Sequence, residues 1–290
     1  MSAYIVVNDG RPVAKVEDKK MYFGIKKQEG KKHVSAASLL PKPKGKSKKK
    51  TLADVEDILE EEDEKDWLGS VMRMKGQDNS LKKLVVSHDK LSYVPNMETR
   101  EALYIAGPAG SGKSYFAAAY ANKYVKLTGN CVYLFSTKDE DKVLDEIPNL
   151  KRVPINEQWA ELEVDYNIFA NSLCIFDDVD SLANKKKIAA AVWGLRDTLL
   201  QNARSNNTYV ISTIHNAFGN RPTITSLQEA HLVVFFPNNG SDHHFRKYLK
   251  ERAGLDPEMI SWIMALESRW VGFYTHAPRF VIWEHGLRVL

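Results

Sequence analysis

From about residue 84 to the C-terminus, short apolar runs alternate with longer amphipathic segments. The runs are four or five residues long, as in strands that are buried on both faces of a sheet. Runs of this kind separated by helical patterns predict an α/β fold with a mainly parallel central sheet flanked by helices. The expected strands are Leu103–Ala106, Cys131–Phe135, Leu173–Phe176, Tyr209–Ser212 and Leu232–Phe236.

The segments between these runs place their apolar side chains at helical spacing, which predicts helices that pack against the sheet. The expected helices are Ser114–Leu127, Lys186–Arg204, His243–Ala253 and Met259–Leu266. Two further strand-like runs, Trp270–His276 and Arg279–Trp283, flank Ala277-Pro278 near the end of the chain. Together they predict a C-terminal β-hairpin.

The first 83 residues carry two blocks of opposite charge. Residues 1–50 contain 14 lysines and arginines against 4 acidic residues, and they end in a lysine-rich run. Residues 51–66 contain 9 acidic residues against 1 lysine. We expect residues 1–50 to form a small β element and a disordered basic arm, and residues 51–83 an acidic helical segment. The arm is consistent with nucleic-acid binding or a nuclear address, and equally with a solvated linker that its acidic neighbour neutralises.

Composition narrows the class of protein. The chain has 290 residues, 43% of them hydrophobic, which is enough for a full globular core. No apolar run reaches the roughly 18 residues that span a bilayer, and the N-terminus lacks a signal-peptide core. The two cysteines argue against a disulfide scaffold and for a reducing compartment. We therefore expect a protein that is neither secreted nor bound to a membrane.

Directly after the first expected strand comes Gly107-Pro-Ala-Gly-Ser-Gly-Lys-Ser114, which fits the Walker A pattern G-x-x-x-x-G-K-[ST]. Glycines let the backbone wrap around phosphate, and a helix N-terminus faces the anion. Lys113 would neutralise phosphate charge, and the Ser114 hydroxyl would ligate Mg²⁺. An ordinary glycine turn would not need the complete pattern. The residues expected to bind ATP are Gly107, Pro108, Ala109, Gly110, Ser111, Gly112, Lys113, Ser114 and Tyr115.

The expected strand Leu173–Phe176 runs into a pair of acids, Asp177 and Asp178. At the edge of a sheet, Asp177 can hold Mg²⁺ together with Ser114, while Asp178 orients and deprotonates the attacking water. Many such ATPases have glutamate at the second position. Hydrophobic strands that end in acids are common, so the pair gains its weight from the Walker A segment that precedes it. The spacing predicts a P-loop NTPase of the ASCE type, with an additional strand between the two motifs, over residues 84–290.

The expected strand from Tyr209 ends in Ser212-Thr213-Ile-His215-Asn216. Polar side chains at this tip are placed to detect the γ-phosphate, and Thr213 and His215 are the candidate catalytic residues there. A strand-end turn capped by serine and asparagine is the structural alternative.

Phosphoryl transfer also needs positive charge beyond that of Lys113, and an arginine from a neighbouring subunit can supply it. Arg204, at the end of a long helical pattern, is the first candidate. For any one arginine a surface salt bridge is the structural alternative. Arg221 and Arg246 are the other candidates.

A run of three lysines, Lys185, Lys186 and Lys187, follows the acidic motif. These lysines are candidates for binding a nucleic-acid backbone. They fit a solvated helix start less well, because cations at a helix N-terminus oppose the helix dipole.

With these motifs in view, the segment from about Tyr104 to His285 resembles the packaging ATPases of large cytoplasmic DNA viruses, including the poxvirus type, and of their virophage relatives. These belong to the FtsK–HerA superfamily of DNA-pumping ATPases. The resemblance lies in the Walker A segment, the acid pair, the strand that ends at His215, and Glu229-Ala-His-Leu-Val-Val-Phe-Phe-Pro237. Residues 1–90 depart from the family pattern.

The resemblance implies a ring of five or six copies that uses ATP and Mg²⁺ to drive double-stranded DNA into a capsid. It also implies a capsid or portal-vertex protein as partner, a location in the virus factory of the host cytoplasm and possible presence in the virion. Arg204 stands where the trans-acting arginine of the family is expected. Other functions open to the sequence are a helicase or a remodelling ATPase, a nucleotide-binding scaffold and a small-molecule kinase. The intact acid pair argues against the scaffold, and the lack of a lid segment argues against the kinase.

Overall fold

The computed structural model describes residues 4–6, 12–16, 23–24, 84–87, 90–162, 164–202, 205–215, 221–237 and 242–290. The expected acidic helical segment 51–83 and the lysine-rich run before it lie outside these residues. Of the N-terminal residues the structure describes the strands β1 (Tyr4–Val6), β2 (Pro12–Val16) and β3 (Phe23–Gly24).

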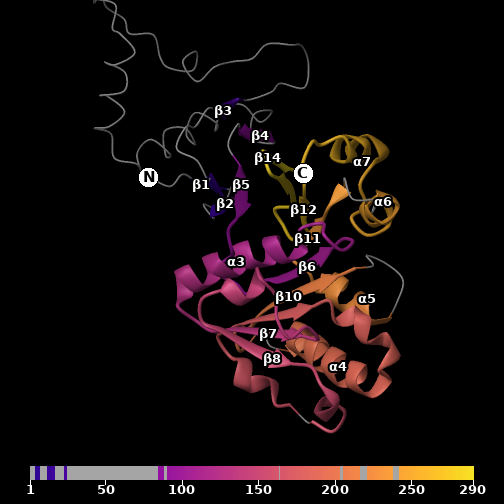
Figure 1. Ribbon diagram of the computed structural model, residues 1–290. Coiled ribbons are helices and arrows are strands. Elements are labelled where there is room, and N and C mark those ends of the chain that lie inside the picture. Colours follow the sequence, from indigo (N-terminus) through magenta and orange to yellow (C-terminus); the bar gives the residue numbers. More distant parts are fainter. Residues whose placement is uncertain are drawn as a thin grey trace, which may run out of the picture.

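Six parallel strands form the core of the molecule, and they confirm the predicted α/β fold (Figure 1). The strands are β6 (Ala102–Ala106), β7 (Val132–Ser136), β8 (Leu150–Pro154), β9 (Leu173–Asp177), β10 (Tyr209–Ile214) and β11 (Leu232–Phe235). Their order in the sheet is β11-β6-β10-β9-β7-β8. Strand β10 therefore pairs with both β6 and β9, and in the sheet it lies between the strand that precedes the phosphate loop and the strand that ends in the acid pair.

Strand β8 is missing from the strands expected from the sequence. It lies at the edge of the sheet and is only partly buried, with Lys151 and Arg152 in its middle. An edge strand needs no continuous apolar run, so its sequence lacks the pattern of the buried strands.

The sheet continues beyond β11 as an antiparallel extension. Strands β12 (Val271–Tyr274) and β13 (Phe280–Trp283) form the predicted hairpin, and β14 (Gly286–Val289), β4 (Leu84–Ser87) and β3 follow in that order. Within the described residues this sheet has 11 strands. A separate sheet of 3 strands has the order β1-β2-β5, where β5 is Leu91–Tyr93.

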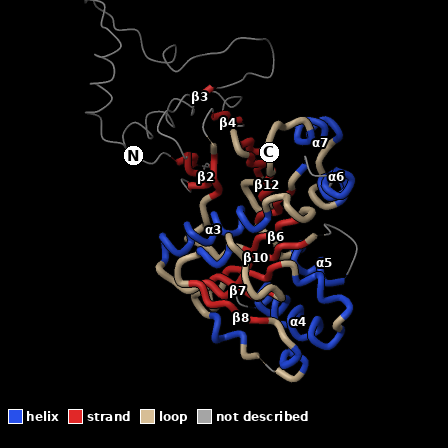
Figure 2. Tube along the Cα trace, in the orientation of Figure 1, coloured by secondary structure: helices blue, strands red, loops and turns tan. Residues whose placement is uncertain are grey.

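Helices cover both faces of the parallel strands (Figure 2). On β6, Leu103 and Ile105 pack in the cluster that contains the apolar side of α3 (Lys113–Thr128), whereas Tyr104 and Ala106 belong to a cluster on the opposite face. That opposite face carries α4 (Lys186–Asn202), α5 (Arg221–Gln228), α6 (Asp242–Glu251) and α7 (Pro257–Met264). The face opposite these four helices is thus covered by α3, which directly follows the phosphate loop.

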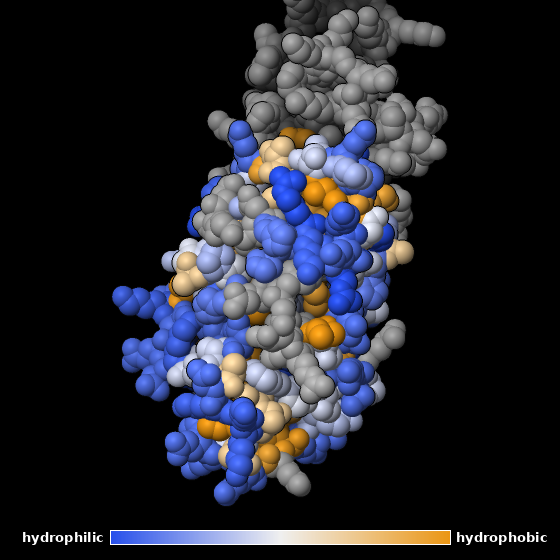
Figure 3. Space-filling view, turned by 90° about the vertical axis from the view of Figure 1, so that its right-hand side faces the viewer, coloured by the Kyte–Doolittle hydropathy of each residue, from blue (hydrophilic) through white to orange (hydrophobic). Residues whose placement is uncertain are grey.

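The surface that carries α5, α6 and α7 is mostly hydrophilic, with apolar side chains in small separate patches (Figure 3). Within the described part of the chain, none of the helices combines the length and the apolar character that crossing a membrane requires.

Candidate nucleotide-binding site

The Walker A segment forms a tight loop between β6 and α3, and its glycines are required by geometry. A Cβ atom on Gly107 would lie 2.7 Å from Ser111 Oγ and 2.9 Å from the Phe236 ring. Gly112 has a φ of 110°, a conformation that residues with a side chain rarely adopt. The Ser111 N–H donates to the Pro108 carbonyl at 3.2 Å, which closes the loop.

At the N-terminus of α3, which follows the loop, backbone N–H groups lack hydrogen-bond partners within the helix. Gly112 precedes the helix and provides no side-chain cap, and the first N–H groups of any helix lack intrahelical partners. The Ser111 Oγ atom is buried without a hydrogen-bond partner among the described residues. Lys113 is 6% exposed, and its Nζ donates to the Gly107 and Pro108 carbonyls at 3.0 and 3.3 Å. These donors fit the phosphate groups of a nucleotide.

The acid pair lies at the carboxyl edge of the same sheet. Asp177 ends β9 and is 1% exposed. Asp178 turns the chain out of the strand with a φ of 51°, and its Oδ1 lies 3.6 Å from Lys113 Nζ. Thr213, on the neighbouring strand β10, donates to Asp177 Oδ1 at 2.9 Å and accepts from the Asp178 N–H at 3.0 Å. The structure thus brings the phosphate loop and both acids together.

The structure adds a residue that the sequence analysis missed. Lys138 follows β7, and its Nζ lies 3.2 Å from Asp177 Oδ2 and 3.3 Å from Asp178 Oδ2. The Ser136 hydroxyl, at the end of β7, donates to Asp177 Oδ2 at 3.5 Å. The carboxyl ends of parallel strands meet at one edge of a sheet. The reasoning that predicted Thr213 at this edge would therefore also have predicted the polar residues at the end of β7.

His215 also contacts the acid pair. Its Nδ1 lies 3.2 Å from Asp178 Oδ1, and its backbone N–H donates to Asp180 Oδ2 at 3.1 Å. The side chains of Asp178, Asp180 and His215 come close enough to share one metal ion. Carboxylate oxygens suit Mg²⁺, so the acids at this edge of the sheet fit the ion that a nucleotide brings with it.

Some of the expected site residues are exposed to solvent, and others lie outside the described residues. Tyr115 is 68% exposed, and Ala109 and Gly110 lie on the surface of the loop. The three lysines 185–187 are exposed around the start of α4 and make no ion pair with any residue that the structure describes. Arg204 and Asn216 lie outside the described residues.

The charges of the site make its stability depend on pH. Burial, and then repulsion by Asp178, raise the pKa of Asp177, while Lys138 acts in the opposite direction. Partial burial acts to lower the pKa of Lys138, but the two carboxylates outweigh it and raise this pKa. Lys138 therefore stabilises the fold most at pH values between these two pKa values, where its ammonium group is charged and Asp177 is ionised. Below the raised pKa of Asp177 this carboxyl group is neutral, and its ion pair with Lys138 is lost.

We therefore expect Lys138→Met to destabilise the protein near neutral pH and much less in acid. In the absence of nucleotide the loss should be about 1–2 kcal/mol near pH 7.5, smaller than for a fully buried ion pair because Lys138 is partly exposed. Urea denaturation at about pH 5 and about pH 7.5 measures the difference. Lys142→Met, at an exposed position nearby, is the control. An equal loss at both pH values would contradict the role of Lys138.

The strand order and the loop together define a P-loop NTPase of the ASCE type. No family model matches the chain. Over 216 residues, however, it is 34% identical to "Uncharacterized protein V3" of Sputnik virophage, a match that covers 73% of this chain and 86% of V3. The chain belongs to the same family as this virophage protein.

Solved structures with similar folds include two proteins of low sequence identity to this chain. The DNA-packaging ATPase B204 of Sulfolobus turreted icosahedral virus is 14% identical, with a TM-score of 0.45, and the match covers 65% of this chain and 98% of B204. The pCW3 conjugation coupling protein TcpA is 11% identical, with a TM-score of 0.47, and the match covers 70% of this chain and 65% of TcpA. The virophage relative agrees with the resemblance drawn from the motifs.

Proposed function

We propose that this protein is an ATP-driven translocase that packages double-stranded viral DNA into a capsid. The observation that carries the ATPase part is the meeting of the phosphate loop and the acid pair at one sheet edge, where Lys113 Nζ lies 3.6 Å from Asp178. The motif set that resembles packaging ATPases supports the DNA part.

In this proposal the loop and Lys113 bind the phosphates of ATP. Ser114 and Asp177 hold Mg²⁺, which would offset charge on the transferred phosphoryl group. Asp178 orients the attacking water and accepts its proton. Thr213 fixes the two acids in position through its hydroxyl, and His215 is placed to respond to a change at Asp178.

The three lysines 185–187 are the proposed DNA contact. The 3₁₀ helix Val179–Asn184 joins them directly to Asp178, so a shift of the acid pair can move them. Helix α4 starts within this lysine run and ends at Asn202, two residues before Arg204. In this proposal α4 therefore connects the DNA contact with the part of the sequence that contains the arginine proposed to act on a neighbouring subunit. A ring of five or six copies, a capsid or portal-vertex partner and a place in the virus factory or the virion are part of the same proposal.

Duplex DNA is expected to stimulate ATP turnover, and replacing the three lysines by glutamine should remove most of this stimulation. Each lysine that binds a phosphate contributes about one unit to the salt dependence of DNA affinity, so the slope should fall by up to about three. Phosphate release and fluorescence anisotropy with duplex DNA measure these quantities.

A control with three glutamines at Lys247, Lys250 and Arg252 removes equal charge in and directly after α6. Equal effects of the two triple variants would contradict a specific contact at residues 185–187.

A triplex assay distinguishes a translocase from a helicase. A translocase should displace the third strand from the triplex without separating the two strands of the duplex.

A further inference from the structure

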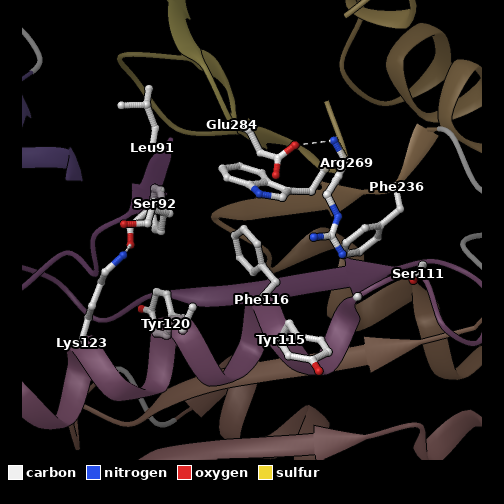
Figure 4. Close-up of a pocket in the computed structure, with 14 residues that line it drawn as sticks. Leu91, Ser92, Ser111, Tyr115, Phe116, Tyr120, Lys123, Phe236, Arg269 and Glu284 are labelled. Carbon is white, nitrogen blue, oxygen red and sulfur yellow. Dashed lines mark hydrogen bonds between the residues drawn. The ribbon is translucent and has the colours of Figure 1, made fainter. Parts of the chain in front are cut away.

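Beside the phosphate loop, a cavity of about 470 Å³ lies between α3 and the open end of the C-terminal hairpin (Figure 4). Ser111 and Gly112 of the loop form one end of its lining. The residues that matter for its chemistry are Tyr115, Phe116, Arg269, Trp270 and Glu284. Pockets for small ligands commonly enclose about 300–1,000 Å³, so the cavity is large enough for a nucleoside.

The register of the hairpin builds the wall opposite α3. Val271 pairs with Trp283, which brings Trp270 and Glu284 next to each other just beyond the paired residues. Three hydrogen bonds then fix the position of Glu284. Its N–H donates to Ser268 Oγ at 3.1 Å, its carbonyl accepts from the Leu91 N–H at 2.6 Å, and its Oε2 accepts from the Arg269 N–H at 2.7 Å.

Aromatic rings line the middle of the cavity. Trp270 contacts Phe116 edge to face, with ring centroids 4.9 Å apart, and both rings border the cavity. Tyr115, in the first turn of α3, is 68% exposed beside them. Flat aromatic surfaces are favourable partners for nucleic-acid bases of any kind because every base has a π face.

Two polar side chains line the same space, and one oxygen of Glu284, Oε2, is already held there by the Arg269 N–H and the Ser268 hydroxyl. The Glu284 side chain is buried, and its second carboxylate oxygen makes no hydrogen bond to any described residue (Figure 4). The Arg269 guanidinium likewise has no ion pair or hydrogen bond within the described part of the chain. A carboxylate oxygen that borders the cavity can accept a hydrogen bond, so the site suits a ligand that presents an N–H group.

We propose that this cavity binds the base and ribose of the nucleotide, and that Glu284 recognises the amino group of adenine. The inference rests on the proposed function, because it places the phosphates of the same nucleotide at Gly107–Ser114. The cavity borders Ser111 and Gly112, so it lies next to the loop that holds the phosphates in this proposal. In this site Glu284 accepts from the 6-amino group, Arg269 donates to a ring nitrogen, and the base lies against Trp270 and Tyr115.

The test compares ATP with ITP, which carries an oxo group in place of the 6-amino group, and with tripolyphosphate, which lacks base and ribose. Calorimetry should show that the wild type binds ATP about tenfold more tightly than ITP, a difference of about 1.4 kcal/mol. In Glu284→Gln, the amide oxygen can keep the bond from the Arg269 N–H while the amide N–H faces the cavity. The preference for ATP should disappear or reverse, and tripolyphosphate should bind as before.

Two variants complete the test. Glu267→Gln, at an exposed position on the same segment, should keep the preference for ATP. Tyr115→Ala, at an exposed position on α3, should weaken ATP and ITP alike and leave tripolyphosphate unchanged. Equal affinity of the wild type for ATP and ITP, or an ATP preference that persists in Glu284→Gln, would overturn the assignment. Tripolyphosphate binding as tight as ATP binding would also overturn it while leaving the phosphate site intact. If the wild type bound neither ATP nor tripolyphosphate, the proposed function itself would fail.

Discussion

Replacing Lys113 with alanine is expected to abolish ATP turnover. The Lys113 ammonium group is almost fully buried, lies against the loop carbonyls and is 3.6 Å from Asp178, between the two halves of the site. No other cation of the described loop can replace it. Loss of a preorganised charge at a developing anion lowers kcat by about 10²–10³-fold or more. Phosphate release with Mg²⁺ and ATP measures the effect.

The matched control is Lys126→Ala, at an exposed position near the other end of α3. It removes the same charge from the same helix and should leave turnover close to that of the wild type. Turnover in Lys113→Ala within a few-fold of the control would show that the phosphates bind elsewhere.

Replacing Asp178 with asparagine is expected to stop hydrolysis while nucleotide binding persists. Asparagine has nearly the same shape, and its backbone N–H can still donate to Thr213. It cannot accept a proton from water, so turnover should fall by about 10²–10⁴-fold. Asp177→Asn should instead weaken the magnesium dependence of binding, because Asp177 is the proposed metal ligand.

Calorimetry and phosphate release on the two variants separate these roles. Asp178→Asn should bind Mg²⁺ and ATP with an affinity close to that of the wild type. Near-normal turnover in Asp178→Asn would show that Asp178 does not accept the proton from water, and Asp177 would be the remaining acid of the pair.

The sequence predicted the parts of the site that depend on local pattern. Buried parallel strands require continuous apolar runs, and a phosphate loop requires glycines at fixed positions, so both leave a clear trace. The acids and Thr213 follow from the same logic, because strand ends meet at one edge of a parallel sheet. The structure brings all of them together as expected.

The missed residues depend on contacts between distant parts of the chain. Lys138 stands in a charged loop, where a lysine in contact with buried acids cannot be told from a solvated one. Trp270 and Glu284 meet only through the register of the hairpin, and the hairpin reaches α3 only through the packing of the whole domain. Arg204 lies outside the described residues, so its role stays a prediction.

Steady-state phosphate release by the purified protein, with and without duplex DNA, tests the central claim most directly. The account predicts release that requires Mg²⁺, rises when duplex DNA is added and disappears in Lys113→Ala. Release no greater than that of Lys113→Ala under all these conditions would contradict it.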